Sequence, residues 1–306
     1  MADEPKLSVV VLSWNTVDLT LACLRSLMAE SPRHSREILV IDNGSTDGSA
    51  DAIAAEFPRL LLVRNDENLG YAAGNNQGAQ RARGTYFCTL NSDTEVQPGA
   101  LDGLIDFLEA NPKYGAVSPR LCSFDGSVQT ACMRFPGLWT ALCYDTVFGK
   151  FWPGSWVEAR YFMRDFDHLT SRDVDQPPGA CFLMRREEYL TMDGLDEELF
   201  LFFNDVDLCR RLKKRGRKIR YLAEETVLHH EGASTKGFKE FIVVWHRNRL
   251  AYYRKHYGPL VMPYMRMIVR LRGLEEWLRA GRKGDPELRR AERAHLRSSL
   301  QEILAR

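Results

Sequence analysis

The chain has 306 residues, 44% of them hydrophobic and 27% charged, a composition typical of a soluble globular protein with one large domain or a domain and an appendage. Its net charge of +1 hides an asymmetry, because residues 1–235 hold 25 Lys and Arg against 34 Asp and Glu, whereas residues 236–306 hold 17 against 7. Such an acidic body argues against a protein that follows nucleic-acid phosphates, so we expect no nucleic-acid partner.

The cysteines and the N-terminus indicate the compartment. Seven cysteines are scattered without a C-x-x-C pair, which favours thiols in a reducing cytoplasm over a disulfide framework or a zinc site. The first residues lack the basic and apolar regions of a secretion signal, and nowhere do about 18 apolar residues run uninterrupted. The sequence therefore predicts a cytoplasmic protein without a membrane-spanning helix.

Short apolar segments rich in β-branched residues alternate with amphipathic ones along the chain. The predicted strands cover residues 7–13, 37–42, 60–65, 86–91, 115–121 and 181–186. The predicted helices cover residues 17–30, 48–56, 70–83, 98–110 and 204–215. This alternation predicts an α/β fold, with βαβ units that form a mostly parallel sheet covered by helices on both faces.

Carboxylates close two of the predicted strands, Asp42 directly and Asp93 two residues after the strand end. In an open parallel sheet, ligands bind beyond the carboxyl ends of the strands. No G-x-G-x-x-G follows the first strand and no G-x-x-x-x-G-K-[ST] occurs, which argues against nicotinamide dehydrogenases and P-loop enzymes. The remaining interpretation is a nucleotide-binding sheet whose acids hold a divalent cation that faces a diphosphate.

Five segments, in this order, resemble the inverting glycosyltransferases of family 2, and within them the bacterial rhamnosyltransferase-like branch. The segments are "VVVLSWN", "ILVIDNGSTDGS", "NDENLGYAAGNNQGAQRARGTYFCTLNSDTEV", "GACFLMRREEYLTMDGLDEELFLFFNDVDLCRRLKKRG" and "HHEGAST". The resemblance extends over about residues 7–260 and implies the GT-A (Rossmann-like) fold. It also implies a nucleotide-sugar donor.

The resemblance implies a nucleotide site at the ends of the first strands. Asp42 would accept the imide N–H of a pyrimidine base, and Asn15, Asn68, Gly70 and Ser92 would border the nucleotide. For Asp47, a helix-capping or Asx-turn role is the favoured interpretation, and for Gly74 and Gly78 it is close packing of a helix on the sheet.

The metal ligands carried over from the family are Asp93 and His229, which would hold Mg²⁺ or Mn²⁺. Asp93 ends the segment Asn91-Ser92-Asp93 at the D-x-D position, where Asn91 replaces the first acid. His229 begins an H-x-x-G-x-S pattern with Gly232 and Ser234. The alternatives are a turn role for Asp93, and His230 in place of His229.

Asp205 matches the acid that deprotonates the acceptor hydroxyl in the family, where a single displacement inverts the anomeric centre. Asn204 replaces the usual glutamate before it. For Asp207 two roles stay open, an ion pair with Arg210 or Arg211 and a contact with substrate.

Two regions lie outside these motifs. Residues 124–166 hold 11 aromatic side chains in 43 positions, which suits an acceptor cleft or a lipid-carrier surface, or equally a subdomain core or a homodimer contact. Residues 261–306 predict two basic amphipathic helices separated near residues 280–286. These helices would bind the inner face of the cytoplasmic membrane, or pack on the acidic body or a partner subunit.

The sequence thus predicts a GT-A glycosyltransferase domain over residues 1–260, with a nucleotide-binding half over about 1–120 and an acceptor-side half over 121–260. Residues 261–306 form the basic helical appendage. The expected donor is a pyrimidine nucleotide sugar, dTDP-rhamnose first, and the expected acceptor a glycan or lipid-linked glycan in cell-surface polysaccharide synthesis. The alternatives are another sugar from a UDP donor, galactose or N-acetylglucosamine, and a GT-A-like binding module without catalysis.

Overall fold

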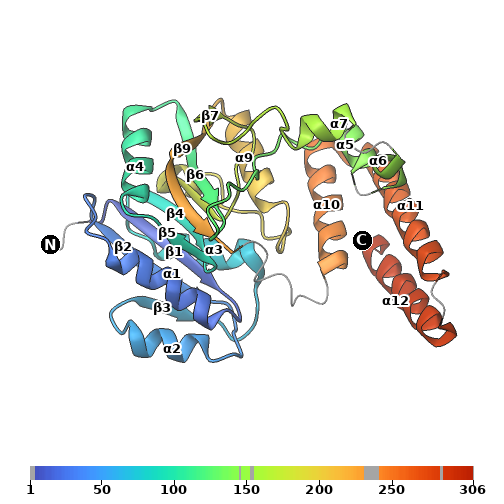
Figure 1. The fold of residues 1–306 in the computed structure, drawn as a ribbon, viewed down its shortest axis with the longest axis horizontal. Helices are drawn as coiled ribbons and strands as arrows, with labels where there is room; N and C mark the ends of the chain where they lie inside the picture. Colours follow the sequence, from blue (N-terminus) through green and yellow to red (C-terminus); the bar gives the residue numbers. More distant parts are fainter. Residues whose placement is uncertain (1–3, 145, 152–154, 231–240, 283–284, 306) are drawn as a thin grey trace. The chain divides into compact units, whose positions relative to one another are not determined.

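The computed structural model describes residues 4–144, 146–151, 155–230, 241–282 and 285–305. The chain divides into two compact units, each described here by itself (Figure 1). The sheet unit comprises residues 1–133, 166–200 and 204–238, and the helical unit comprises 134–165, 201–203 and 239–306. The predicted domain boundary after residue 260 stays a prediction. The helix that precedes residue 260, at residues 241–257, belongs to the same compact unit as the helices that follow it.

The sheet unit is built on one mixed sheet in the order β3-β2-β1-β4-β8-β6-β9-β5, with β7 paired to β9. Among the described strands, β5, β7 and β8 run opposite to the other six. The strands are β1 (Leu7–Ser13), β2 (Arg36–Asp42), β3 (Leu61–Arg64), β4 (Tyr86–Asn91), β5 (Thr94–Val96), β6 (Tyr114–Cys122), β7 (Arg172–Asp173), β8 (Cys181–Arg185) and β9 (Lys218–His229).

Helices cover both faces of this sheet, as predicted (Figure 1). Successive side chains of a strand point to opposite faces. Val9 and Val11 of β1 belong to the apolar core on the face of α1, α2 and α4, whereas Val10 and Leu12 face α3. The helices of the sheet unit are α1 (Val17–Ala29), α2 (Ser49–Glu56), α3 (Gly70–Arg81), α4 (Ala100–Ala110), α8 (Arg186–Leu190) and α9 (Asn204–Lys214).

Two glycines let α3 approach β1 closely. A Cβ atom added at Gly74 would lie 2.5 Å from Cδ1 of Leu12, and one at Gly78 would lie still closer to Val10. Real Cβ atoms do not approach other carbons this closely, so a larger residue at either position would force Leu12 or Val10 to move. The predicted packing role of Gly74 and Gly78 is therefore confirmed.

The helical unit contains the three long helices α10, α11 and α12 and three short ones. Tyr253 and Tyr257 of α10 donate hydrogen bonds to the carbonyls of Gly137 and Pro136, and Tyr264 of α11 donates to Leu138. These bonds hold the start of α5 against the long helices. The elements are α5 (Leu138–Cys143), α6 (Val147–Phe151), α7 (Trp156–Tyr161), α10 (Phe241–Tyr257), η1 (Pro259–Val261), α11 (Met262–Ala280) and α12 (Pro286–Leu304).

All predicted strands and helices are present, with ends that differ from prediction by one or two residues. The sequence did not predict the strands β5, β7 and β9, nor the helices α5–α8 and α10. The break near residues 280–286 is confirmed, since α11 ends at Ala280 and α12 begins at Pro286. Across the described residues, every helix is too short or too polar to cross a membrane.

Candidate active site

The strand register brings the predicted site residues to one edge of the sheet. Ser13 at the end of β1 pairs with Asp42 at the end of β2, and Leu12 pairs with Asn91 at the end of β4. Because β1 lies between β2 and β4, the segments after Asp42 and Asn91 flank the end of β1. This edge is called the carboxyl edge below.

Asp42 is buried at this edge, with 2% of its surface exposed. Its Oδ1 accepts a hydrogen bond of 3.0 Å from the backbone N–H of Ser45. Among the described residues, its buried Oδ2 has no hydrogen-bond partner. Because a buried acceptor without a partner is costly, Asp42 fits a role in which a ligand donates to Oδ2. An imide N–H of a pyrimidine is such a donor.

Asn15 and Ser92 connect the loops around Asp42. Asn15 Oδ1 accepts a 2.8 Å hydrogen bond from the N–H of Thr46, and its own N–H donates to Ser45 Oγ. The hydroxyl of Ser92 lies 2.9 Å from that of Thr16. These bonds fix the loop after β1 to the loops after β2 and β4.

Asn68 and Gly70 occupy the loop that leads into α3. Asn68 Oδ1 accepts hydrogen bonds of 2.9 Å from Asn43 Nδ2 and from the N–H of Gly70. Gly70 has a positive φ of 87°, and an added Cβ would lie 2.5 Å from the carbonyl oxygen of Phe200. Both facts require glycine there for structural reasons, independently of any ligand.

Asp47, in contrast, already accepts hydrogen bonds from the protein at both carboxylate oxygens. Its Oδ1 accepts from the N–H of Ser49 at 3.0 Å, and its Oδ2 accepts from the N–H of Val17 at 3.0 Å. Burial alone would raise the pKa of Asp47, but these hydrogen bonds outweigh burial and lower it. The predicted Asx-turn role is confirmed, and the same side chain supports the start of α1.

Asp93 and His229 meet where β5 pairs with β9. Thr94 of β5 lies opposite His229, and the Nε2 atom of His229 lies 3.5 Å from Oδ1 of the buried Asp93. Gln129 sets the ring orientation: its Nε2 donates to the carbonyl of His229 at 2.9 Å, so its Oε1 accepts from Nδ1 of the ring at 2.9 Å. In neutral His229, the lone pair is therefore on Nε2, which faces the carboxylate.

This arrangement fits a divalent cation. A lone pair and a carboxylate oxygen that face each other at 3.5 Å repel unless a proton or a cation lies between them. Oδ1 of Asp93 has no hydrogen-bond partner within the described part of the chain, so it remains available as a ligand. A metal-binding histidine usually donates its other N–H to an oxygen, and Gln129 provides that oxygen.

His230 does not share this position. Its backbone N–H donates to the carbonyl of Asp93 at 2.8 Å, while its ring stacks on Phe124 with centroids 3.8 Å apart. The geometry therefore favours His229 over His230 as the partner of Asp93. Gly232 and Ser234, which complete the predicted pattern, lie outside the described residues.

Asp205 lies in the first turn of α9, beside the loop that leads into β8. An added Cβ at Gly179 would lie 3.2 Å from its Oδ2, and the next residue, Ala180, accepts a hydrogen bond from the N–H of Asn91. Gln176 Nε2 donates to Oδ2 at 3.3 Å. Burial raises the pKa of the Asp205 carboxyl, and hydrogen bonds from Val206 and Gln176 only partly oppose this. Asp205 thus lies at the carboxyl edge as a carboxylate of increased basicity.

The neighbouring acid has a different environment. Asp207 is fully buried, and its Oδ2 accepts a 2.8 Å hydrogen bond from Nε of Arg211. The guanidinium also donates to the carbonyls of Met192 and Gly194. The ion-pair interpretation of Asp207, with Arg211 as partner, is confirmed. Asn204 is buried and donates from Nδ2 to the carbonyl of Leu199 at 2.9 Å, so this residue stabilises the start of α9.

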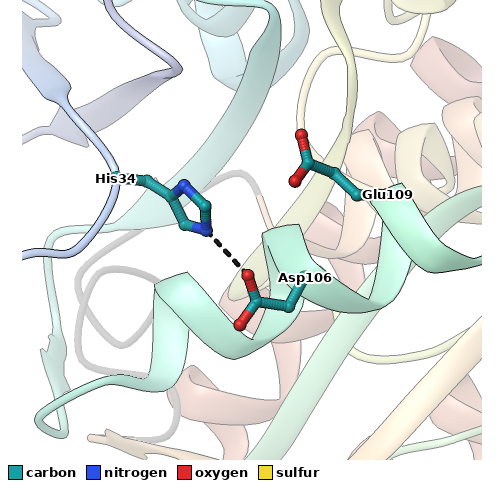
Figure 2. A group of neighbouring side chains, drawn as sticks. All are labelled: His34, Asp106 and Glu109. Atoms are coloured by element: carbon teal, nitrogen blue, oxygen red, sulfur yellow. Dashed lines mark hydrogen bonds and ion pairs between the residues drawn. The ribbon is translucent and has the colours of Figure 1, made fainter.

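A second group of metal-ligand side chains lies at the opposite, amino edge of the sheet. Figure 2 shows His34, Asp106 and Glu109, the one group of three in the described residues whose ligand atoms all lie within 4.8 Å of one another. Arg33 already pairs with Asp106 at 2.7 Å, and Lys6 pairs with Glu109. Both acids are thus neutralised by the protein's own cations, and a metal ion would have to displace them.

A cavity of about 420 Å³ also opens at the amino edge, between α1, β2 and β3. The buried charged residues in its lining, Glu30 and Arg36, pair with each other. This cavity therefore offers no unpaired acid, unlike the carboxyl edge.

Sequence reasoning did not single out Gln129 or Gln176. Gln129 lies 100 residues before His229, and Gln176 lies 29 residues before Asp205, both in irregular segments. Gln176 could have been noticed because it lies three residues before the "GACFLM" segment that resembles the family. Gln129 carries no comparable signal in the sequence.

The sheet, its carboxyl edge and the acids there define a glycosyltransferase of the GT-A fold. A family model described as Glycosyl transferase family 2 matches residues 8–189. The chain belongs to this family, and it is an enzyme that transfers a sugar.

Two relatives of this chain have names that agree with its assignment to the glycosyltransferases. The chain is 32% identical over 222 residues to the N-acetylglucosaminyl-diphospho-decaprenol L-rhamnosyltransferase of Mycobacterium tuberculosis strain H37Rv. The aligned region is 69% of this chain and 70% of that protein. Over 238 residues it is 30% identical to the O-antigen biosynthesis protein RfbC of Myxococcus xanthus, covering 76% of this chain and 18% of that protein.

Two solved structures share the fold. One is GalNAc-T7 with UDP, GalNAc and Mn²⁺, at a TM-score of 0.58 and 16% identity, covering 85% of this chain and 52% of that one. The other is the mannosyltransferase PcManGT of Pyrobaculum calidifontis with GDP-Man and Mn²⁺. Its TM-score is 0.55 and its sequence identity 16%, and the match covers 100% of this chain and 89% of that one. At this identity they show the fold alone.

Proposed function

We propose that the protein is a metal-dependent, inverting glycosyltransferase that moves rhamnose from dTDP-rhamnose to a hydroxyl of a lipid-linked glycan acceptor. The observation that carries the proposal is the pair of Asp93 and His229 at the carboxyl edge. Their facing oxygen and nitrogen atoms, 3.5 Å apart, suit a cation that meets the donor's diphosphate.

The nucleotide would bind around Asp42. Its unpartnered Oδ2 suits the imide N–H of thymine or uracil, which adenine lacks. Asn15, Asn68, Gly70 and Ser92 border the same loops and would contact the nucleoside and the first phosphate. This assignment favours a pyrimidine over adenine, and comparison with GDP is needed to separate guanine, whose N1–H is also a donor, from the pyrimidines.

Asp93 and His229 would hold Mg²⁺ or Mn²⁺, with the remaining ligands from water and from diphosphate oxygens. When bound, the cation stabilises negative charge on the departing nucleoside diphosphate. Gln129 would keep Nε2 of His229 oriented toward that position through its hydrogen bond to Nδ1.

Asp205 would take the proton of the acceptor hydroxyl as the hydroxyl oxygen bonds to the anomeric carbon and the bond to the diphosphate breaks. One displacement inverts the anomeric configuration. The raised pKa of Asp205 suits this role, because a more basic carboxylate accepts the proton more readily. Gln176 would hold the carboxylate in place.

The choice of rhamnose draws on the mycobacterial relative, whose name specifies an L-rhamnosyltransferase that uses a decaprenyl-diphosphate-linked N-acetylglucosamine. That name also motivates a lipid-linked acceptor here. Another sugar from a UDP donor, galactose or N-acetylglucosamine, is the competing assignment.

Thermal unfolding with UDP, dTDP, GDP and ADP, each with and without Mn²⁺, tests the donor site. A ligand at 100 times its dissociation constant adds about 2.7 kcal/mol to stability. We expect stabilisation by dTDP or UDP only with Mn²⁺, and not by ADP or GDP. Stabilisation independent of Mn²⁺, or equal for all four nucleotides, would contradict the site assignment. Transfer from dTDP-rhamnose against UDP-N-acetylglucosamine then decides the sugar.

A further inference from the structure

Exposed apolar side chains and positive charge gather in the same unit. The helical unit makes up about one third of the chain, yet it holds 12 of the 18 large hydrophobic side chains that are exposed among the described residues. Its ranges contain 20 Lys and Arg against 10 Asp and Glu, whereas the sheet unit contains 22 against 31. The helical unit thus combines net charge +10 with exposed apolar surface.

One face of α11 carries part of this surface. Met267, Leu274 and Leu278 follow one another at helical spacing, with Arg270 between them, and all four are exposed. The other side of α11 is occupied, because an added Cβ at Gly273 would lie 2.5 Å from Leu300 of α12. The exposed face is therefore not needed to hold the helical unit together.

The short helices extend the surface. Leu260 of η1 is 93% exposed. In the sequence it lies between Tyr257 and Tyr264, whose hydroxyls donate hydrogen bonds to the carbonyls of Pro136 and Leu138. The start of α5 is therefore attached to the chain on both sides of Leu260. We call the following set the apolar patch: Leu138, Trp139, Phe148, Phe151, Trp156, Leu260, Met267, Leu274 and Leu278.

Other aromatic residues of the same segment are turned inward. Tyr144, Tyr161 and Phe162 pack on one another, and Tyr144 also packs on Trp245 of α10. The prediction of a packed subdomain core is thus confirmed for these residues, and it does not account for the apolar patch. Phe151 and Trp156 are instead 84% and 71% exposed.

We propose that the apolar patch, together with Arg270 and the net positive charge of the helical unit, binds the surface of an anionic lipid bilayer. Tryptophan and phenylalanine side chains partition into the headgroup region, and arginines beside them pair with anionic headgroups. Because none of the described helices can cross a bilayer, the contact is peripheral.

Two other occupants fit less well. If the helical unit of a second copy covered the patch, two units that each carry a net charge of +10 would face each other and repel. The acidic sheet unit of another copy has suitable charge, but among the described residues it exposes only six large hydrophobic side chains over about two thirds of the chain. These residues are Met28, Leu61, Leu69, Phe124, Leu169 and Leu190.

The test is co-sedimentation of the full chain, without nucleotide, with vesicles of phosphatidylcholine and phosphatidylglycerol in equal parts, and with phosphatidylcholine alone. We expect binding to the anionic vesicles that weakens as salt is added. Arg270→Glu should weaken binding on the order of tenfold, because it reverses one charge at the surface. Phe151→Ser with Leu260→Ser should weaken it on the order of tenfold or more.

Controls lie in the sheet unit, where Met28→Ser with Leu61→Ser removes two apolar side chains that are 54% and 48% exposed and Arg59→Glu reverses an exposed charge. These variants should bind vesicles as the wild type does. Equal losses in the controls, or no binding of the wild type to anionic vesicles, would overturn the proposal. So would dissociation of a dimer by the patch variants in size measurements without lipid. Because no donor or acceptor is present, failure here leaves the transferase proposal untouched.

Discussion

Acidic side chains lie at both edges of the sheet, but those at the two edges differ in whether the protein itself pairs them. At the amino edge, Asp106 pairs with Arg33 and Glu109 with Lys6. At the carboxyl edge, Asp42 and Asp93 each bury one oxygen that has no hydrogen-bond partner in the described residues. The comparison teaches that a cluster of ligand-type side chains is informative only when the protein leaves some of their atoms unpaired. The compact group in Figure 2 fails that criterion, whereas the looser group at the carboxyl edge meets it.

The largest expected effect is at Asp205. Asp205→Asn keeps the shape of the side chain but cannot accept the acceptor proton, so transfer should fall by about 10²–10⁴-fold. Stabilisation by nucleotide and Mn²⁺ should stay at the wild-type level. Initial rates of transfer and thermal shifts measure the two properties separately, and a variant with near-normal rates would exclude Asp205 as the base.

The same substitution should stabilise the protein at neutral pH. Burial raises the pKa of Asp205 above its usual 3.8, so the folded chain holds this proton to higher pH than the unfolded chain does. The charged carboxylate therefore costs stability, increasingly as pH rises from 3.8 through the folded pKa. The gain from Asp205→Asn should vanish below pH 3.8, and the transfer rate of the wild type should fall as pH drops through the raised pKa.

A matched pair at the two edges gives the next effect. Asp93→Asn should lose the part of nucleotide stabilisation that depends on Mn²⁺, about 2.7 kcal/mol at 100 times the dissociation constant. Asp106→Asn, at the amino edge, should retain all of it. Thermal unfolding at fixed nucleotide and varied Mn²⁺ measures both variants, and the reverse result would move the metal site to the amino edge.

The smallest effect concerns the ion pairs at the amino edge. Hydrogen bonds from His34 and Arg33, against some opposing burial, lower the pKa of Asp106 below 3.8. Its contribution to stability is therefore present above pH 3.8 and is lost as pH falls through the folded pKa. Because Asp106 is partly exposed, Asp106→Asn should cost about 0.5–1 kcal/mol at neutral pH. Urea unfolding of both proteins at neutral and acid pH measures the difference, and a cost that persisted in acid would point to lost packing.

Most of the sheet could be predicted because β1, β2, β4, β6 and β8 are mostly buried and read as apolar runs. The long strand β9 was not predicted, because charged residues interrupt its apolar ones. Asp42 and Asp93 could be placed at one edge because the carboxyl ends of parallel strands meet there. The short strand β5 could not be predicted, since three residues carry no periodicity. Its pairing with β9 is nevertheless what brings His229 to Asp93.

The composition of the helical unit was also beyond sequence reasoning. Residues 134–165 precede α10 by about 80 positions, and they join it through tyrosine hydroxyls that bind backbone carbonyls. Such contacts leave no pattern in the sequence, because any carbonyl can accept them. The partner of Asp207 was predictable, because Arg211 lies one helical turn away.

The register of β9 has a consequence for comparing chains of this family. Pro119 of β6 pairs with Leu222 and the next residue, Arg120, pairs with Thr226, so β9 holds three residues, 223–225, where β6 has none. These three residues form a bulge, so a deletion or insertion at 223–225 changes the length of the bulge and leaves the pairing of Thr226–His229 with β5 and β6 in place. Which of two adjacent histidines faces Asp93 is thus decided by the pairing of β9 with β5, downstream of the bulge. Chains of this family that differ in length at 223–225 are therefore best aligned from the residues after the bulge.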